Sequence, residues 1–117
     1  MRTVTFYRTL NDQCPVEAFL DSLTGKQAQK VLWVLQLIEE LELVPRQYFK
    51  KLVDGDGIWE VRIRFGNDIF RLLGFFASGT SLVLTNGFVK KTRKTPPQEI
   101  ALAIRRKNEY FARRAKQ

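Results

Sequence analysis

The feature that most constrains the fold is a series of three apolar runs in the second half of the chain. The runs Ile58–Phe65, Ile69–Phe76 and Ser81–Val89 are separated only by Gly66-Asn67-Asp68 and Ala77-Ser78-Gly79-Thr80. Short polar connectors of this kind join antiparallel neighbours, because parallel strands need a crossover of a dozen or more residues. The sequence therefore predicts an antiparallel meander at the centre of the fold.

The N-terminal part is predicted to supply one strand and two helices. Thr3–Tyr7 alternates polar and apolar side chains, which is typical of a half-buried strand. From Pro15 the apolar residues recur at helical spacing until Gly25, and Lys26–Leu43 repeats this spacing until Pro45 stops it. Two consecutive amphipathic segments separated by a glycine favour a helical hairpin.

A last helix is predicted to begin after Thr95. Thr95 and Gln98 have the spacing of a capping box, and Pro96 suits the first turn of a helix. The predicted fold class is α+β, with the order β-α-α-β-β-β-α: an antiparallel sheet with an N-terminal helical hairpin and a C-terminal helix. No linker or repeat interrupts the chain, so residues 1–117 are predicted to form a single domain.

The positive charge of the chain is localised at its C-terminal end. Residues 1–85 hold ten Lys or Arg and ten Asp or Glu, whereas residues 86–117 hold ten Lys or Arg against Glu99 and Glu109 only. A localised basic excess attracts polyanions through counterion release, so nucleic acid, a membrane surface or an acidic protein are the candidate partners. The alternative is a solvated charged face. Four arginines of this segment are predicted to hold RNA at longer range: Arg105, Arg106, Arg113 and Arg114.

The compartment is predicted from the cysteine count and from the longest apolar stretch. The lone Cys14 has no second cysteine with which to form a disulfide, which favours a reducing environment. No stretch approaches the roughly 18 apolar residues of a membrane span, and the N-terminus has no apolar signal region. We therefore expect a cytoplasmic protein without a membrane partner.

A row of charges is predicted on one face of the first strand of the meander. Alternation within Ile58–Phe65 places the apolar side chains on one face and Glu60, Arg62 and Arg64 on the other. Arg71 lies amid apolar residues of the next run, where a hairpin would bring it across from this row. Two interpretations stay open: a cross-strand salt bridge between Glu60 and Arg71, or a carboxylate held among arginines at a phosphodiester site.

A second basic cluster lies between the last strand and the last helix. It consists of Lys90, Lys91, Arg93 and Lys94. A helix N-terminus already favours an anion, so a phosphate is expected to bind there. Lys50 and Lys51, just before the meander, are predicted to extend this basic rim. Nearby aromatic side chains are candidates for base stacking, although aromatic residues in strands are more often core: Tyr48, Phe49 and Phe88.

Several kinds of chemistry are excluded by composition. The chain has no histidine and one cysteine, so neither a His-based mechanism nor a zinc site of the usual His and Cys ligands is available. No glycine-rich phosphate loop or dinucleotide fingerprint is present. Catalysis would rest on Glu, Lys, Arg or Tyr, and we expect no metal and no cofactor.

One stretch carries a family resemblance. The run Asn86-Gly87-Phe88-Val89-Lys90-Lys91-Thr92-Arg93-Lys94-Thr95-Pro96, together with Trp59-Glu60-Val61-Arg62 and Phe70-Arg71-Leu72, resembles the HigB-like, phage-derived branch of the RelE/ParE toxin superfamily. The resemblance covers residues 3–115. It implies a toxin of a type II toxin–antitoxin pair, neutralised by a helix-turn-helix antitoxin encoded beside it.

The resemblance also implies an activity and a set of roles. Relatives are ribosome-dependent mRNA endoribonucleases, which use the ribose 2′-hydroxyl against the adjacent phosphate. The roles implied here are Glu60 as base, a set of arginines around the phosphate (Arg62, Arg64 and Arg71), and one lysine as donor or clamp (Lys90, Lys91 or Lys94). Of these, the predicted catalytic residues are Glu60, Arg62, Arg71 and Lys91. The RNA-binding residues implied are Lys50, Lys51, Arg64, Lys90, Arg93 and Lys94.

On the second helix, Trp33, Val34 and Leu37 widen the apolar surface. They either lie between two layers or form the surface for the antitoxin.

The sequence departs from the family pattern at two positions. Asn86 stands where many members have His before Gly-Phe. Ribonuclease relatives often have a Tyr or His near the C-terminal end as the acid, whereas the last aromatic hydroxyl here, that of Tyr110, lies well inside the last helix. Two alternatives to a ribonuclease therefore remain open. One is a gyrase-inhibiting toxin of the ParE type, and the other is a non-catalytic RNA- or ribosome-binding module of phage origin.

Overall fold

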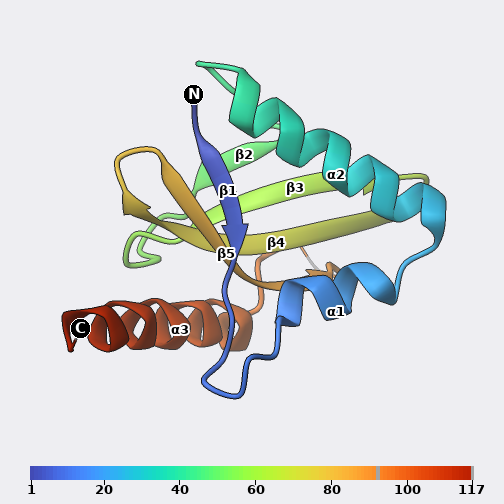
Figure 1. Ribbon diagram of the computed structural model, residues 1–117. Coiled ribbons are helices and arrows are strands. Elements are labelled where there is room, and N and C mark those ends of the chain that lie inside the picture. The colour runs from blue at the N-terminus through green and yellow to red at the C-terminus, as the bar shows by residue number, and fades with distance from the viewer. Residues whose placement is uncertain (92, 117) are drawn as a thin grey trace.

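A five-stranded sheet forms the centre of the molecule (Figure 1). The structure is a computed structural model that describes residues 1–91 and 93–116. The strands are β1 (Thr3–Phe6), β2 (Phe49–Lys51), β3 (Trp59–Phe65), β4 (Asp68–Ser78) and β5 (Ser81–Val89). Their order in the sheet is β1-β5-β4-β3-β2. The predicted meander is confirmed, since β3, β4 and β5 pair antiparallel, whereas β1 lies parallel to β5 at one edge.

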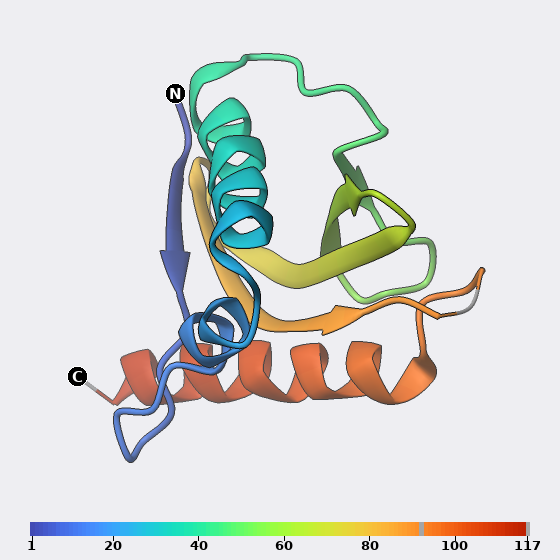
Figure 2. The same ribbon diagram turned by 90° about the vertical axis from the view of Figure 1, so that its right-hand side faces the viewer.

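The strands differ from the sequence prediction in their number and length. β2, only three residues long, is absent from that prediction; it pairs antiparallel with β3, with Phe49 opposite Val61. β4 is longer at both ends, because Asp68 pairs with Phe65 and Ser78 pairs with Ser81. Backbone hydrogen bonding thus continues through polar residues that the sequence pattern places in connectors. The register of β4 and β5 also shifts at Gly74, and Figure 2 shows that β5 bends along its length.

Three helices complete the fold: α1 (Pro15–Asp21), α2 (Gly25–Glu40) and α3 (Pro97–Ala115). α2 begins with a capping box, in which the Gln27 amide N–H donates to the Thr24 hydroxyl and the Thr24 N–H donates to the Gln27 side chain. These two bonds satisfy backbone and side-chain groups reciprocally and fix the turn between α1 and α2. No helix within the described ranges is long and apolar enough to cross a membrane.

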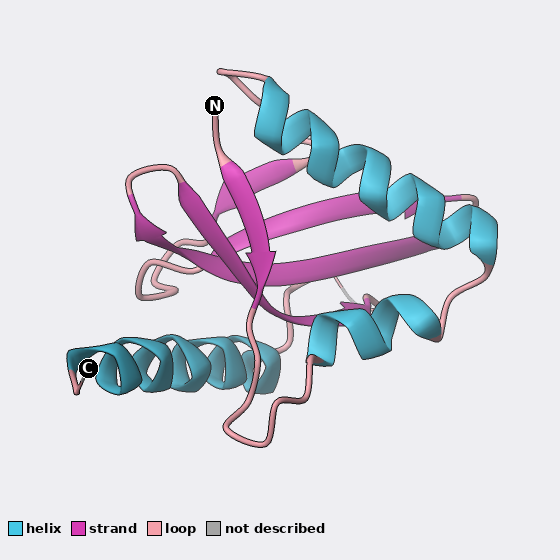
Figure 3. Cartoon of the chain, viewed as in Figure 1, coloured by secondary structure: helices cyan, strands magenta, loops and turns pink. Residues whose placement is uncertain are grey.

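The helices cover the two faces of the sheet (Figures 2 and 3). The hairpin of α1 and α2 packs on one face, and its buried residues join those of the sheet in the larger core. This core includes Val16, Val31, Val34, Leu35, Ile38, Val61, Ile63, Phe70, Leu72, Leu82 and Leu84. α3 packs on the other face, mainly against β4 and β5, where Ala103 meets Leu73, Phe75 and Val83. The α+β fold class, with its hairpin and its C-terminal helix, is confirmed.

The start of α3 differs from the prediction. Its N-cap is Pro96 rather than Thr95, and no side chain caps the helix. The Thr95 hydroxyl instead donates to Glu60 Oε2, at 2.5 Å. The prediction of a Thr95 capping box is therefore wrong: the helix begins one residue later than predicted, and the Thr95 side chain is turned toward a buried carboxylate on β3.

Candidate nucleic-acid site

α3 covers only part of the sheet face on which it packs, and a charged part of that face stays open. Its packing lies mainly on β4 and β5. On β3 the side chains of the predicted charged row lie on this same face, and Arg62 pairs directly with Arg71 across β3 and β4. Lys50 on β2 lies opposite Glu60. The prediction that a hairpin brings Arg71 across from the row is confirmed.

Glu60 lies at the buried end of this row. Its side chain is 0% exposed, and its two carboxylate oxygens are both engaged. Arg71 NH1 donates to Oε1, the Thr95 hydroxyl donates to Oε2, and Arg62 Nε lies 3.9 Å from Oε1. The salt bridge with Arg71, one of the two interpretations left open by the sequence, is therefore formed. A base that takes a proton from RNA would need exposed oxygen atoms, which this geometry does not offer.

Arg71 is almost as deeply buried as its partner. Its side chain is 1% exposed, and burial lowers the pKa of its guanidinium, while the Glu60 carboxylate opposes that effect. Within the described part of the chain, Arg71 Nε is a buried nitrogen without a hydrogen-bond partner. A buried donor left without a partner is costly, so its presence calls for an explanation such as a catalytic role or a bound water or ion.

A pocket of about 420 Å³ opens beside this pair. It is lined by Arg62, Ile69, Arg71, Lys90, Lys91 and Arg93. Among the residues that the structure describes, five of these six are Arg or Lys, so the pocket concentrates positive charge from β3, β4 and the segment after β5. We call it the basic pocket. Such a cluster matches a phosphate in charge, and guanidinium and ammonium groups are the donors that phosphates bind.

Lys90 has the most altered environment among the lysines of the basic pocket. Its amino group donates to the Arg93 carbonyl. Burial lowers the pKa of Lys90, and the neighbouring positive charge of Arg71 lowers it further. Both effects disfavour the charged form of the Lys90 amino group relative to that of a free lysine.

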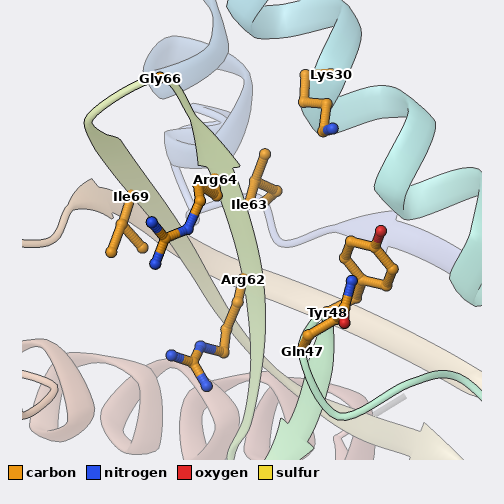
Figure 4. A pocket seen from close by; sticks show the side chains of 8 residues that line it. All are labelled: Lys30, Gln47, Tyr48, Arg62, Ile63, Arg64, Gly66 and Ile69. Carbon is orange, nitrogen blue, oxygen red and sulfur yellow. The ribbon is translucent and has the colours of Figure 1, made fainter.

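A second pocket, of about 560 Å³, lies across the free edge of β3 (Figure 4). It is lined by Lys30, Gln47, Tyr48, Arg62, Ile63, Arg64, Gly66 and Ile69. We call it the edge pocket. Figure 4 shows Lys30 and Tyr48 on one side of β3, with Arg62 and Arg64 extending on the other. Arg62 and Ile69 line both pockets, so the two adjoin each other.

The structure brings together some of the predicted RNA-binding residues and separates others. Arg62, Arg64, Arg71, Lys90, Lys91 and Arg93 line the two pockets. Lys50 and Lys51 line a hollow beside Trp59 and Phe76, although the charge of Lys50 is near enough to Lys90 to lower its pKa. Lys94 is exposed in the segment before α3. The sequence does not predict Lys30, Gln47 and Thr95 as site residues, because the residues around them do not indicate which distant strand or helix they face.

Some of the predicted stacking and long-range residues have structural contacts instead. Phe49 is buried and stacks on Trp59 at 4.7 Å, so of the two interpretations of this residue, base stacking or core, it has the core position. Arg106 donates to the Thr85 carbonyl at 2.8 Å, and Arg113 pairs with Glu109. Arg106 therefore fixes α3 against β5, whereas Arg113 pairs within α3 and also donates to the Arg8 carbonyl at 3.1 Å. Other predicted residues are half-buried or exposed: Phe88 is half-buried, while Arg105 and Arg114 are exposed.

Asn86, which stands where many relatives have His, ties β5 to α3. Its side-chain oxygen accepts from the Thr85 hydroxyl at 2.5 Å, and its Nδ2 donates to Glu99 Oε1 at 2.9 Å. The Asn86 side chain is nearly buried. Its contacts therefore position the first turn of α3.

The predicted antitoxin surface on α2 is only partly exposed. Val34 is 0% exposed and belongs to the larger core, so the prediction that it binds a partner is wrong. Trp33 is 45% exposed, and Leu37 is half-buried. Trp33 contacts Tyr48 edge to face, with 5.9 Å between ring centroids. Helical spacing alone does not reveal which side of a broad apolar surface faces the sheet.

The fold and its basic face define a class of protein: a small α+β module of the RelE-like type, with a cationic cavity on the open half of its sheet. Residues 18–108 match the family described as phage derived protein Gp49-like (DUF891). Because this match covers most of the chain, the protein belongs to that family, which is part of the RelE/ParE-like toxin superfamily. No curated protein sequence matches the chain.

Proposed function

We propose that this protein is a HigB-like toxin of a type II toxin–antitoxin pair, and that it cleaves mRNA on the ribosome in the cytoplasm without a metal ion. The observation that carries the proposal is the basic pocket. A buried arginine with an unpaired Nε lines it together with four further cations. Membership of a toxin-like, phage-derived family supports the same class.

The proposed reaction needs charge stabilisation more than a dedicated cofactor. The ribose 2′-oxygen attacks the adjacent phosphorus, the bond from phosphorus to the 5′-oxygen breaks, and a proton moves from the 2′-hydroxyl toward the leaving oxygen. Arg62, Arg71 and Arg93 would stabilise the crowded phosphorane, because fixed cations act where negative charge develops. Lys90, with its lowered pKa, is the proposed proton-transfer group, and Lys91 the second clamp.

Glu60 has a different role in this proposal from the one its sequence position implied. Its carboxylate is buried and saturated by Arg71 and Thr95. We therefore propose that Glu60 positions Arg71 in the basic pocket and does not itself contact RNA. Arg71 is then held at one orientation, which preorganises the pocket for the phosphate.

The test is a cleavage assay with end-labelled RNA. Purified protein is incubated with free RNA in EDTA and, separately, with ribosomes programmed with the same message. Cleavage is expected to leave a 2′,3′-cyclic phosphate and a 5′-hydroxyl, and a 2′-deoxy nucleotide at the cleaved position is expected to block it. Arg62→Ala is expected to lower the rate about 100-fold, because it removes a cation from the developing charge.

The matched control for that assay is Lys26→Ala. Lys26 is exposed at the start of α2 and lines neither pocket, so this variant removes one positive charge without touching the site. Its cleavage rate is expected to equal that of the parent. Equal losses in both variants would show that only net charge matters, and the assignment of the basic pocket would be wrong.

A second candidate function is a non-catalytic RNA-binding module. The burial of Glu60 favours it, since a carboxylate already neutralised by Arg71 does not repel an RNA backbone. The same assay separates the two functions. Parent protein that binds RNA but cleaves neither free nor ribosome-bound message would establish the binding module and overturn the nuclease.

The proposed partner is the helix-turn-helix antitoxin, and Trp33 is the proposed anchor because it is the exposed aromatic of α2. Trp33→Asp is expected to weaken binding of the product of the neighbouring gene at least tenfold, measured by calorimetry. Phe111→Asp, an exposed aromatic on α3, is the control and is expected to bind normally. Unchanged affinity of Trp33→Asp would exclude this surface.

A further inference from the structure

The edge pocket has the composition of a nucleotide site rather than of a phosphate site alone. The basic pocket is lined almost entirely by cations, whereas the edge pocket combines an aromatic ring, an amide and three cations. Stacking on a ring serves every base, because each base has a π-face, while cations serve its phosphate.

Tyr48 is fixed in position at this pocket. Its ring contacts Trp33 edge to face, and Lys30 Nζ lies 5.0 Å from the centroid of the Trp33 ring. Trp33 therefore supports both Tyr48 and Lys30, although Lys30 comes from α2 and Tyr48 from the loop before β2. An aromatic ring held by such a contact loses little further conformational entropy when a base stacks on it.

The backbone at the pocket adds a polar edge. The Arg62 N–H points toward β2, where it donates to the Tyr48 carbonyl at 2.8 Å. Peptide groups two residues apart in a strand point in the same direction, so those of Arg64 also point to this edge. β2 covers Phe49–Lys51, opposite Val61 to Trp59, and does not run beside Arg64. The peptide groups of Arg64 and the side-chain amide of Gln47 therefore offer hydrogen-bond donors and acceptors to the edge of a base.

The position of Arg62 links the two pockets into one path. Arg62 lines both, and its side chain is 34% exposed. A phosphate held in the basic pocket would therefore have its neighbouring nucleotide near the free edge of β3. Charge along this path is uniformly positive, from Lys91 and Arg93 through Arg62 to Arg64 and Lys30, as a single strand of RNA requires.

We propose that the edge pocket is a nucleotide subsite, in which Tyr48 stacks on the base next to the phosphate of the basic pocket, and Lys30 and Arg64 hold the following phosphate. This inference rests on the proposed action on RNA and deepens it. It identifies a ring and a lysine that no cleavage chemistry requires, so their loss affects binding of RNA and its position more than proton transfer.

The test measures binding to RNA that cannot be cleaved. The probe is a fluorescent, fully 2′-O-methylated six-nucleotide RNA, titrated with parent protein by anisotropy. Tyr48→Ala is expected to weaken binding about tenfold, whereas Tyr48→Phe, which keeps the ring, is expected to bind as the parent does. An abasic residue at the nucleotide that stacks on Tyr48 is expected to weaken parent binding equally and to cause no further loss in Tyr48→Ala.

Lys30→Ala gives a second measurement that does not depend on the Tyr48 side chain. It is expected to reduce the slope of log affinity against log salt by about one, because one phosphate contact is lost. Lys26→Ala, one turn earlier on α2 and outside both pockets, is expected to keep the parent slope. Thermal unfolding of each variant confirms that it is folded at the assay temperature.

The outcomes separate this inference from the proposed function. Parent-like binding by both Tyr48→Ala and Lys30→Ala overturns the subsite, whatever the cleavage assay shows. Loss of antitoxin binding with unchanged RNA binding in these variants would identify a protein-docking pocket and also overturn it. Weaker RNA binding by both variants, together with a parent protein that binds RNA without cleaving it, overturns the nuclease and supports the subsite.

Discussion

Glu60→Ala is expected to lower the free energy of unfolding by about 3–5 kcal/mol, because removing one partner leaves the guanidinium of Arg71 buried and unpaired. Arg71 is 1% exposed, so water does not replace the lost carboxylate. Urea denaturation at neutral pH measures the change. Glu60→Gln keeps the side-chain shape and an acceptor oxygen, and a smaller loss is expected.

A double variant tests whether the pair itself is the cause. Glu60→Leu combined with Arg71→Met replaces both charges by apolar side chains of similar volume, and its stability is expected to recover most of the loss. If the double variant were as unstable as Glu60→Ala, the unpaired charge of Arg71 would not be the cause of the lost stability. Cleavage adds a second readout: Glu60→Gln is expected to retain most activity and the parent pH profile. A folded Glu60→Gln without activity would return Glu60 to the role of base.

The second large effect is expected at Gly74. A Cβ atom at Gly74 would lie 2.4 Å from the Val83 carbonyl oxygen and 3.1 Å from the Leu84 Cα. The clashing atoms are backbone atoms of β5, at the register shift between Leu73 and Gly74, so relief requires the two central strands to separate. Gly74→Ala is expected to cost about 3 kcal/mol or more, which thermal or urea unfolding measures.

Gly79→Ala is the matched control. Gly79 lies in the tight turn between β4 and β5, and a Cβ atom added there would have no neighbouring atom within 4 Å. The stability of this variant is expected to stay within about 0.5 kcal/mol of the parent, as for surface substitutions in general. Similar losses at Gly74 and Gly79 would show that glycine flexibility, and not the close approach of β5, is the determining factor.

The spacing of apolar residues predicts those helices and strands whose signals lie within the segment itself. The meander, the helical hairpin and the position of Arg71 across from the charged row all follow from the spacing of apolar residues and from short connectors. Such patterns identify an element and its apolar side. They carry no information on which distant segment lies beside it.

The errors of the sequence prediction all concern distant partners. β2 has only three residues, two of them lysines, and exists because β3 offers it an edge. Thr95 has the spacing of a cap, but a carboxylate 35 residues earlier takes its hydroxyl. Val34 and Trp33 are neighbours on a broad apolar helix, and only the docked sheet decides which one is buried. The candidate site depends on the same long-range packing, so its pockets were not predictable from spacing.

The parallel pairing of β1 with β5 has a consequence for synthesis of the chain. Thr3 pairs with Ser81 and Phe6 with Leu84, so the first strand to be made finds its place only after the last strand has been made. Contacts between such distant segments slow folding, and β1 keeps its apolar side chains unpaired in the growing polypeptide. A nascent chain that stops before residue 81 therefore lacks a completed sheet, and the proposed toxin becomes competent to act only when nearly all of it has left the ribosome.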